Sequence, residues 1–131
     1  MAEDPENTLK VAHQAFEHFR HGLATGEWQL FLDMLSDDFS FWFPVGPYHG
    51  LNVGKERASA FFDYLSDVFS SGLCLTLDRV TSNQTTVVFE FRDAGLMRGQ
   101  DYKNRVAVSF DVCGGLICGY REYFGSDGKS N

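Results

Sequence analysis

The sequence has no apolar run long enough to span a bilayer, so a membrane-spanning helix is not expected. Its first residues, MAEDPEN, are acidic and polar, which is unlike a secretory signal peptide. Basic residues are also few: 11 Lys and Arg stand against 18 Asp and Glu, which gives a formal net charge of −7. Because the Lys and Arg are scattered, we expect neither nucleic acid nor an anionic membrane surface as a partner.

Cysteine is scarce as well, and Cys74, Cys113 and Cys118 show no spacing typical of a metal site. The simplest interpretation is free, buried thiols in a reducing cytosol, so a cytoplasmic protein is expected. Cys113 and Cys118 flank a predicted hairpin turn, and a disulfide between them is the alternative. His18 and His21 have helical spacing, but they project away from the apolar stripe and no further ligand is evident. We therefore expect no metal and no organic cofactor.

Aromatic residues, in contrast, are abundant. They make up 15% of the chain, and 13 of the 131 residues are Phe. This length fits one domain, residues 1–131, with one core, and no repeats, linkers or low-complexity segments interrupt it. Since Phe fills wide spaces between layers, we expect a broad core or an apolar cavity.

The first half of the chain has the apolar period of helices. Asp4 and Pro5 are typical of a helix start, and the helix that follows ends near Gly22 to Gly26. A short helix is predicted within 27–36, a short strand at 39–44, and a turn-rich loop after that strand. Residues 55–72 then form a further amphipathic helix.

After Gly72 the apolar period changes from 3.6 to 2, which is typical of strands. Four are predicted, with a loop at 94–101: residues 73–82, 85–93, 102–112 and 116–124. Helices followed by antiparallel strands predict an α+β fold in which the helices pack on one face of a curved, mostly antiparallel sheet.

Strand alternation assigns the side chains of the last strands to faces. In 85–93 the apolar residues are expected to face the core, so Glu90 and Arg92 should lie on the outer face and form salt bridges there. The alternative is that they form a polar pair inside an apolar cavity. In the last strand one face is expected to hold five side chains: Leu116, Cys118, Tyr120, Glu122 and Phe124.

Two segments resemble a known family. The first, GEWQLFLDMLSDDFSFWFPVGPYHG, has a Gly-acidic start, an aromatic strand and a closing His-Gly; the second, YKNRVAVSFDVCGGLICGYREYF, is a hairpin that ends in an acidic-aromatic pair. With the order of elements, they resemble the nuclear transport factor 2-like superfamily, in particular its SnoaL-like polyketide cyclase and ketosteroid isomerase branch. The resemblance implies a cystatin-like cone with a deep apolar pocket at one end, and a homodimer formed through the outer face of the sheet.

The positions that ketosteroid isomerases use for chemistry are apolar here. Their Asp base matches Phe43, their oxyanion Tyr matches Phe19, and their protonated Asp falls near Val106 or Ala107. Proton transfer at the carbon next to a carbonyl requires a general base and a hydrogen-bond donor to the oxyanion, and both are missing at these positions. Ketosteroid isomerase activity is therefore not expected.

Two other branches of the superfamily direct attention to Glu122. The run REYF resembles the Arg-Asp-Tyr-Phe run that ends the last strand of limonene epoxide hydrolases, and Glu122 takes the acidic place. The Arg-x-Asp pair of that branch corresponds to FEFRD, where Glu90 and Arg92 stand in reversed order. SnoaL-like cyclases use an acid/base near these last strands, and Glu122 is the candidate for that role.

The resemblance points the face of Glu122 into the pocket, where a carboxylate among aromatic rings loses hydration and its pKa is expected to rise. Asn104 and Tyr102 on the neighbouring strand are its expected hydrogen-bond partners. The alternative is a solvated strand-end acid, or one paired with an Arg across the sheet.

The predicted function is binding of a small hydrophobic molecule that carries a ring or a carbonyl, with acid/base catalysis of the cyclase, isomerase or hydrolase type. Glu122 and Asn104 are the predicted catalytic residues. The predicted pocket residues are Phe19, Phe43, Tyr48, His49, Phe62, Tyr102, Val106, Tyr120 and Phe124. The alternative is a non-catalytic module that binds a small ligand or dimerises.

Overall fold

The computed structural model describes residues 4–125, which form three α-helices, one short 3₁₀ helix and six strands. The helices are α1 (Pro5–Thr25), α2 (Gln29–Leu32), α3 (Lys55–Val68) and the 3₁₀ turn Gly46–Tyr48. The strands are β1 (Leu35–Phe43), β2 (Gly50–Val53), β3 (Leu73–Ser82), β4 (Thr86–Met97), β5 (Gln100–Cys113) and β6 (Leu116–Gly125). The predicted start of the first helix is confirmed, because the Asp4 carboxylate accepts a hydrogen bond from the backbone N–H of Glu6.

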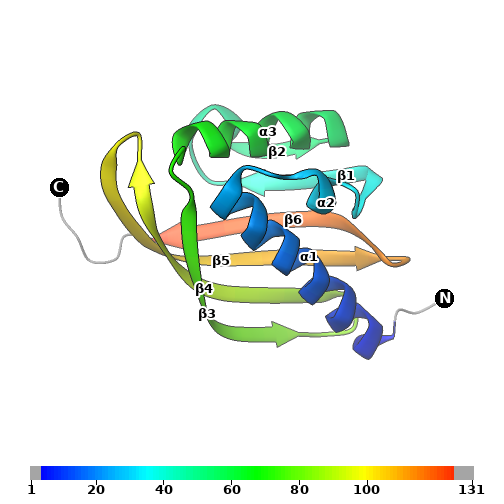
Figure 1. Ribbon diagram of the computed structural model, residues 1–131. Helices are drawn as coiled ribbons and strands as arrows, with labels where there is room; N and C mark the ends of the chain where they lie inside the picture. The colour runs from blue at the N-terminus through cyan, green and yellow to red at the C-terminus, as the bar shows by residue number, and fades with distance from the viewer. Residues whose placement is uncertain (1–3, 126–131) are drawn as a thin grey trace.

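The strands form one sheet in the order β2-β1-β6-β5-β4-β3. Only the pairing of β1 with β6 is parallel among the strands described, and all other neighbours are antiparallel. Figure 1 shows α1 crossing the sheet and α3 lying along its β1–β2 side, so the helices cover one face. This arrangement confirms the predicted α+β fold class.

Two segments predicted as loops belong to the sheet. Residues 50–53 form β2, which pairs with β1 and buries Asn52, whose side-chain amide donates to the carbonyl oxygens of Tyr48 and Gly50. Strands β4 and β5 continue to Met97 and from Gln100, so the predicted loop 94–101 is reduced to a two-residue turn. In both places the pairing depends on a partner strand, and the local sequence is rich in turn residues.

A β-bulge in β6 changes which residues face the core. Asp111 pairs with Gly119 but Val112 pairs with Ile117, so Cys118 is the extra residue. Ile117 is therefore fully buried, and Leu116 is exposed. The prediction of a shared inner face is wrong for Leu116 and Cys118. It holds for Tyr120, Glu122 and Phe124, which lie beyond the bulge.

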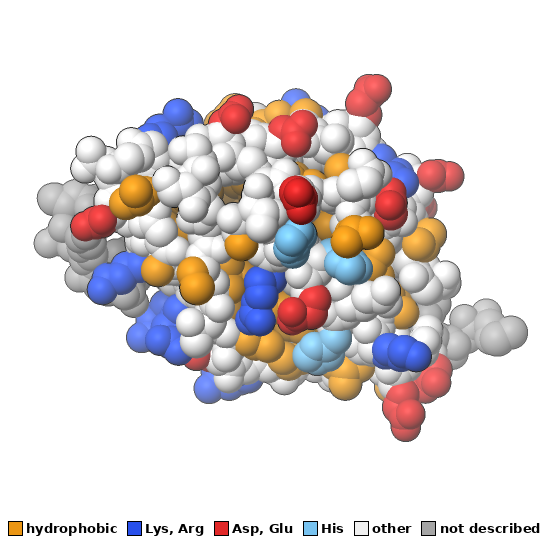
Figure 2. Space-filling view, viewed as in Figure 1, with side chains coloured by type: hydrophobic (Ala, Val, Ile, Leu, Met, Phe, Trp, Pro, Cys, Tyr) orange, Lys and Arg blue, Asp and Glu red, His pale blue; other side chains and the backbone are white. Residues whose placement is uncertain are grey.

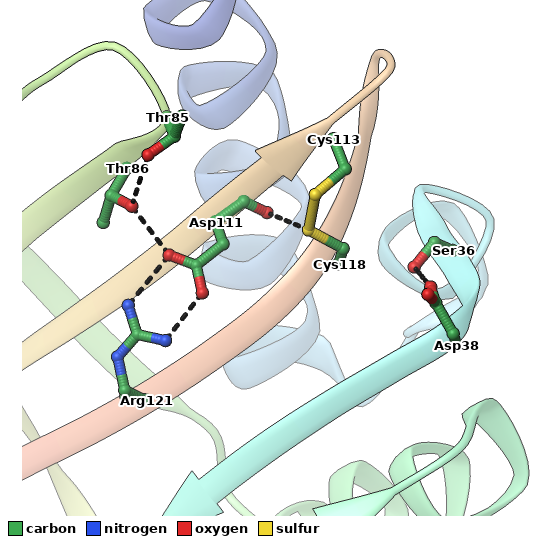
Figure 3. Close-up of a disulfide and its surroundings, with 8 residues drawn as sticks. All are labelled: Ser36, Asp38, Thr85, Thr86, Asp111, Cys113, Cys118 and Arg121. Carbon is green, nitrogen blue, oxygen red and sulfur yellow. Dashed lines mark hydrogen bonds and ion pairs between the residues drawn. A yellow bond between two sulfur atoms is a disulfide. The ribbon is translucent and has the colours of Figure 1, made fainter. Parts of the chain in front are cut away.

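The prediction of free, buried thiols is also wrong. Cys113 and Cys118 form a disulfide across the β5–β6 hairpin, with their Cα atoms 5.8 Å apart (Figure 3), and Cys74 is free but exposed. The tight turn at Gly114 and Gly115 and the bulge at Cys118 bring the two sulfur atoms together at the end of the hairpin.

The core between the helices and the sheet is built mainly from aromatic rings. Phe16 of α1 stacks on Phe89 of β4 with ring centroids 4.4 Å apart, and Phe41 of β1 stacks on Phe61 of α3 at 4.7 Å. Ten aromatic side chains lose nearly all contact with solvent: Phe16, Phe19, Phe31, Phe39, Phe41, Phe61, Phe62, Phe89, Phe110 and Tyr120. The broad aromatic core expected from the composition is present.

The helix-covered face carries mixed charge. In Figure 2 acidic and basic side chains are interspersed on this face, so it presents no continuous basic surface. Within residues 4–125, no helix is long and apolar enough to cross a membrane, and no group of His, Cys, Asp or Glu side chains is placed to hold a metal ion.

Candidate functional site

A pocket of about 280 Å³ lies between α1, α3 and the inner face of the sheet. Most of its wall is apolar and comes from both helices and from β1, β3, β4, β5 and β6. The polar groups of the wall are four side chains in addition to Tyr64: Asp93, Tyr102, Asn104 and Glu122. A pocket that is apolar except for a few grouped polar side chains is typical of a small-molecule site.

Strand pairing and alternation bring these four side chains to one wall. Asp93 on β4 pairs with Asn104 on β5, and Tyr102 lies two residues away on the same face of β5. Glu122 projects from β6, the other neighbour of β5, where it pairs with Val108. The Asn104 side-chain amide donates to the Tyr102 hydroxyl at 3.3 Å.

Glu122 is partly exposed, and it lines the pocket. Loss of hydration raises the pKa of its carboxyl group to about 7; the hydrogen bond from Tyr120 acts in the opposite direction, and the charge of Asp93 adds to the rise. The rise expected from the sequence is therefore found. At neutral pH both protonation states of Glu122 are populated.

The hydrogen-bond partner of Glu122 differs from the expected ones. The Tyr120 hydroxyl donates to Oε1 of Glu122, whereas Asn104 and Tyr102 bond to each other. The physical reason is the register, because Glu122 lies opposite Val108 rather than opposite Asn104. Tyr120 is almost completely buried, and its burial, together with the charge of Glu122, raises the pKa of its hydroxyl.

Asp93 is the member of the group that sequence reasoning missed. The residue is only 7% exposed, and its Oδ1 accepts no hydrogen bond within residues 4–125. Burial raises the pKa of Asp93 to about 6, against the effect of the backbone N–H groups of Asn104 and of Asp93 itself. A signal was available, since the alternation of Val87, Phe89 and Phe91 on the inner face continues to residue 93.

Tyr102 remains a proton donor throughout the neutral range. Burial and the charge of Asp93 raise the pKa of its hydroxyl to about 12, with a smaller contribution from the charge of Glu122. The amide of Asn104 offers both a donor and an acceptor beside it.

The structure places six of the sequence-predicted site residues in the pocket wall: Phe19, Phe43, Tyr102, Asn104, Glu122 and Phe124. Val106, Tyr120 and Phe62 lie buried beside the pocket, and they are part of the core.

Tyr48 and His49 are not part of the pocket wall. Tyr48 packs on Phe61 and under the guanidinium of Arg57, which is 4.1 Å from its ring centroid. His49 is exposed, near Trp42. The reason is that the segment expected to rim the pocket continues into β2, at the edge of the sheet.

The prediction for Glu90 and Arg92 is confirmed, because both lie on the outer face. Glu90 pairs with Arg79 at 3.1 Å between Oε1 and Nη1, and the Arg92 guanidinium donates to both carboxylate oxygens of Asp78. The pocket therefore receives neither of them.

Residues 16–120 match the family model of the SnoaL-like domain. The chain belongs to this family. Consistent with that, an NTF2-like protein from Anabaena variabilis ATCC 29413 is 70% identical to this SnoaL-like domain. The match covers 100% of this chain and 98% of that one, with a TM-score of 0.92.

More distant structures share the fold of this SnoaL-like domain. An LEH-like epoxide hydrolase from M. tuberculosis is 22% identical over 88% of this chain and 84% of its own, with a TM-score of 0.70. SalBIII, an epoxide hydrolase/cyclase-like enzyme with a role in pyran ring formation in the polyether salinomycin, is 13% identical over 93% of each chain, with a TM-score of 0.75. At these identities the likeness shows the fold alone. No curated protein matches the sequence.

Proposed function

We propose that this SnoaL-like domain binds a small apolar molecule in the pocket and that Glu122 acts on it as a general acid and base. The observation that carries this proposal is a carboxyl group with a pKa of about 7 in an apolar pocket. A proton donor and acceptor is most effective when its pKa lies near the working pH. The second carboxylate, Asp93, supports this role because its charge helps to keep the proton on Glu122.

The other polar groups of the wall have positioning roles in this proposal. The Tyr102 hydroxyl and the Asn104 amide would orient a carbonyl, a hydroxyl or a water molecule, and the rings of Phe19, Phe43 and Phe124 would contact the apolar part of the ligand. Epoxide hydrolysis and pyran ring formation, which occur in proteins of this fold, both require a proton to reach or leave an oxygen atom. The apolar Phe19 and Phe43 argue against ketosteroid isomerase chemistry.

The test is turnover of a panel of aryl epoxides and hydroxy-epoxides, with hydrolysis and ring closure followed by mass spectrometry. Glu122→Gln is expected to reduce the rate constant by about 10²- to 10⁴-fold. Asp111→Asn, which removes a carboxylate from the outer face, is the matched control and should retain the rate. If Glu122→Gln keeps the wild-type rate, acid/base catalysis by Glu122 is wrong. The same holds if the Glu122 carboxyl carbon titrates near pH 4.5 in NMR spectra.

We also propose a homodimer formed through the outer face of the sheet, because apolar side chains gather there. Trp42 of β1 stacks on Tyr123 of β6 with centroids 5.3 Å apart, and Leu51 of β2, which pairs with Trp42, is 69% exposed. Burial of such a group against a second copy would remove it from water. Light scattering should give twice the chain mass for the wild type and the single-chain mass for Leu51→Glu. A monomeric wild type at 100 µM, roughly the upper range for a specific dimer, contradicts this proposal.

A further inference from the structure

The charge of the pocket wall is of one sign. The described residues that line the pocket include two carboxylates, Asp93 and Glu122, and no Lys, Arg or His. Asp93 is more than nine-tenths buried, and its Oδ1 has no hydrogen-bond partner within residues 4–125. A buried acceptor without a donor is rare in folded proteins, because the missing hydrogen bond is not replaced by water. A ligand that brings a donor would satisfy it.

In the part of the chain that the structure describes, the arginines that directly precede these carboxylates pair with other acids. Arg92 and Arg121 directly precede Asp93 and Glu122 in the sequence, but strand alternation turns their side chains to the outer face. There Arg92 donates to Asp78, and Arg121 donates to both oxygens of Asp111 at 2.6 and 2.8 Å. The positive charge that would balance the pocket must therefore come from outside the pocket wall.

The rest of the wall also suits a cation. Aromatic rings surround the pocket from both helices and from four strands, among them Phe19, Tyr64, Phe69, Phe91 and Phe124. The negative face of an aromatic ring attracts an ammonium group, and this attraction increases when water is excluded. A carboxylate guest would instead be repelled by Asp93 and Glu122, and a neutral alcohol would gain a hydrogen bond without the charge interaction.

We propose, building on the function proposed above, that the ligand of this pocket is an apolar amine, bound as its ammonium cation with the nitrogen beside Asp93. The ammonium supplies the donor that Oδ1 of Asp93 lacks, and its charge balances the carboxylates. The apolar body of the amine lies among the rings of the wall, within reach of Glu122. The pocket selects against the alcohol and, more strongly, against the carboxylate of the same shape.

The test compares three probes that differ in one group: 2-phenylethylamine, 2-phenylethanol and phenylacetate. Their dissociation constants are measured by calorimetry and ligand-observed NMR at pH 7.5 and low salt. We expect the amine to bind at least about tenfold more tightly than the alcohol, and phenylacetate not to bind. Equal or tighter binding of the alcohol overturns the amine proposal.

Two variants test whether Asp93 is the residue that makes the amine bind more tightly than the alcohol. Asp93→Asn should weaken amine binding by about tenfold and leave alcohol binding unchanged, whereas Asp111→Asn on the outer face should change neither. If the amine keeps its advantage in Asp93→Asn, the proposed role of Asp93 is overturned. Circular dichroism checks that Asp93→Asn is folded; if it is not, Glu122→Gln provides the same comparison, because it also removes one of the two charges.

The outcomes separate this proposal from the proposed function. If the amine and the alcohol bind equally well, the amine class is wrong, and the apolar pocket with its acid/base remains. If none of the three probes binds and none shifts the resonances of Asp93 or Glu122, both the amine proposal and the proposed ligand pocket are wrong. If the amine binds but the Glu122 carboxyl carbon titrates near pH 4.5, the ligand class is supported and the proposed catalysis is contradicted.

Discussion

The two faces of the sheet treat carboxylates in opposite ways. On the outer face, Asp78 and Asp111 each accept hydrogen bonds from an arginine, and these bonds lower the pKa of both carboxyl groups (Figure 3 shows Asp111). On the inner face, the causes that shift the pKa of Asp93 and Glu122 include no arginine among the described residues, and burial raises their pKa values to about 6 and about 7. Acidic side chains on the outer face are therefore held ionised by arginine, whereas those on the inner face titrate near neutral pH.

The difference shows that neighbours in the sequence need not interact in the fold. Arg92 precedes Asp93 and Arg121 precedes Glu122, yet the period of two sends each arginine to the face opposite its acidic neighbour. The ion pair of Asp111 with Arg121 on the outer face also depends on Gly119, because a Cβ atom at this position would overlap the Asp111 carboxylate. The sheet thus places each of these arginines on its outer face and the acidic neighbour on its inner face.

The largest effect is expected from Glu122→Gln, which should raise the free energy of unfolding at pH 8.5 by about 2 kcal/mol. The pKa of Glu122 in the folded state, about 7, lies above its ordinary value of 4.5. The folded state therefore holds the proton more tightly, and wild-type stability falls as the pH rises from about 4.5 through about 7. The neutral amide avoids this loss.

Urea unfolding at pH 4 and pH 8.5 measures this difference. The free energies of unfolding of the wild type and Glu122→Gln should differ little at pH 4, where Glu122 is protonated in the folded state and in much of the unfolded state. At pH 8.5 the variant should be the more stable of the two. A gap of the same size at both pH values would contradict burial of the carboxylate as its cause.

Asp111→Asn should have a smaller effect of opposite sign, a loss of about 1 kcal/mol at pH 7. The hydrogen bonds from Arg121 lower the pKa of Asp111 below its ordinary value of 3.8. Its stabilising contribution is therefore present above that value and is lost as the pH falls through the lower pKa of the folded state. Urea unfolding at pH 7 and pH 2.5 checks this, and a variant that is more stable than the wild type at pH 7 would show that the ion pair does not stabilise the fold.

Asp78→Asn should have the smallest effect. The pair of Asp78 with Arg92 has the same bidentate form, but it lies exposed to solvent, where water and salt weaken the attraction. We expect the thermal midpoint to change by no more than about 1 °C in low and high salt. A loss as large as that of Asp111→Asn would mean that exposure does not distinguish the two pairs.

Much of the fold could be predicted because its signals are local. The cap at Asp4, the helical stripe of α1 and the alternation of β3 to β5 each depend on residues a few positions apart. The outward position of Glu90 and Arg92 follows from the same period. The raised pKa of Glu122 could also be anticipated. Glu122 alternates with aromatic residues that face inward, and a carboxyl group at such a position loses hydration whichever residues are its hydrogen-bond partners.

The sequence by itself therefore determined most of the helices and strands, the family and the acid of the last strand. Only the tertiary structure decided that 50–53 would pair as β2 and that a bulge would turn Cys118 toward Cys113. It also decided that Asp93 would line the pocket beside Glu122, with no hydrogen-bond donor to its Oδ1 among residues 4–125. These features depend on contacts between distant segments. The pocket itself is the space that the aromatic core leaves unfilled between α1, α3 and the sheet, and packing in three dimensions determines where that space lies.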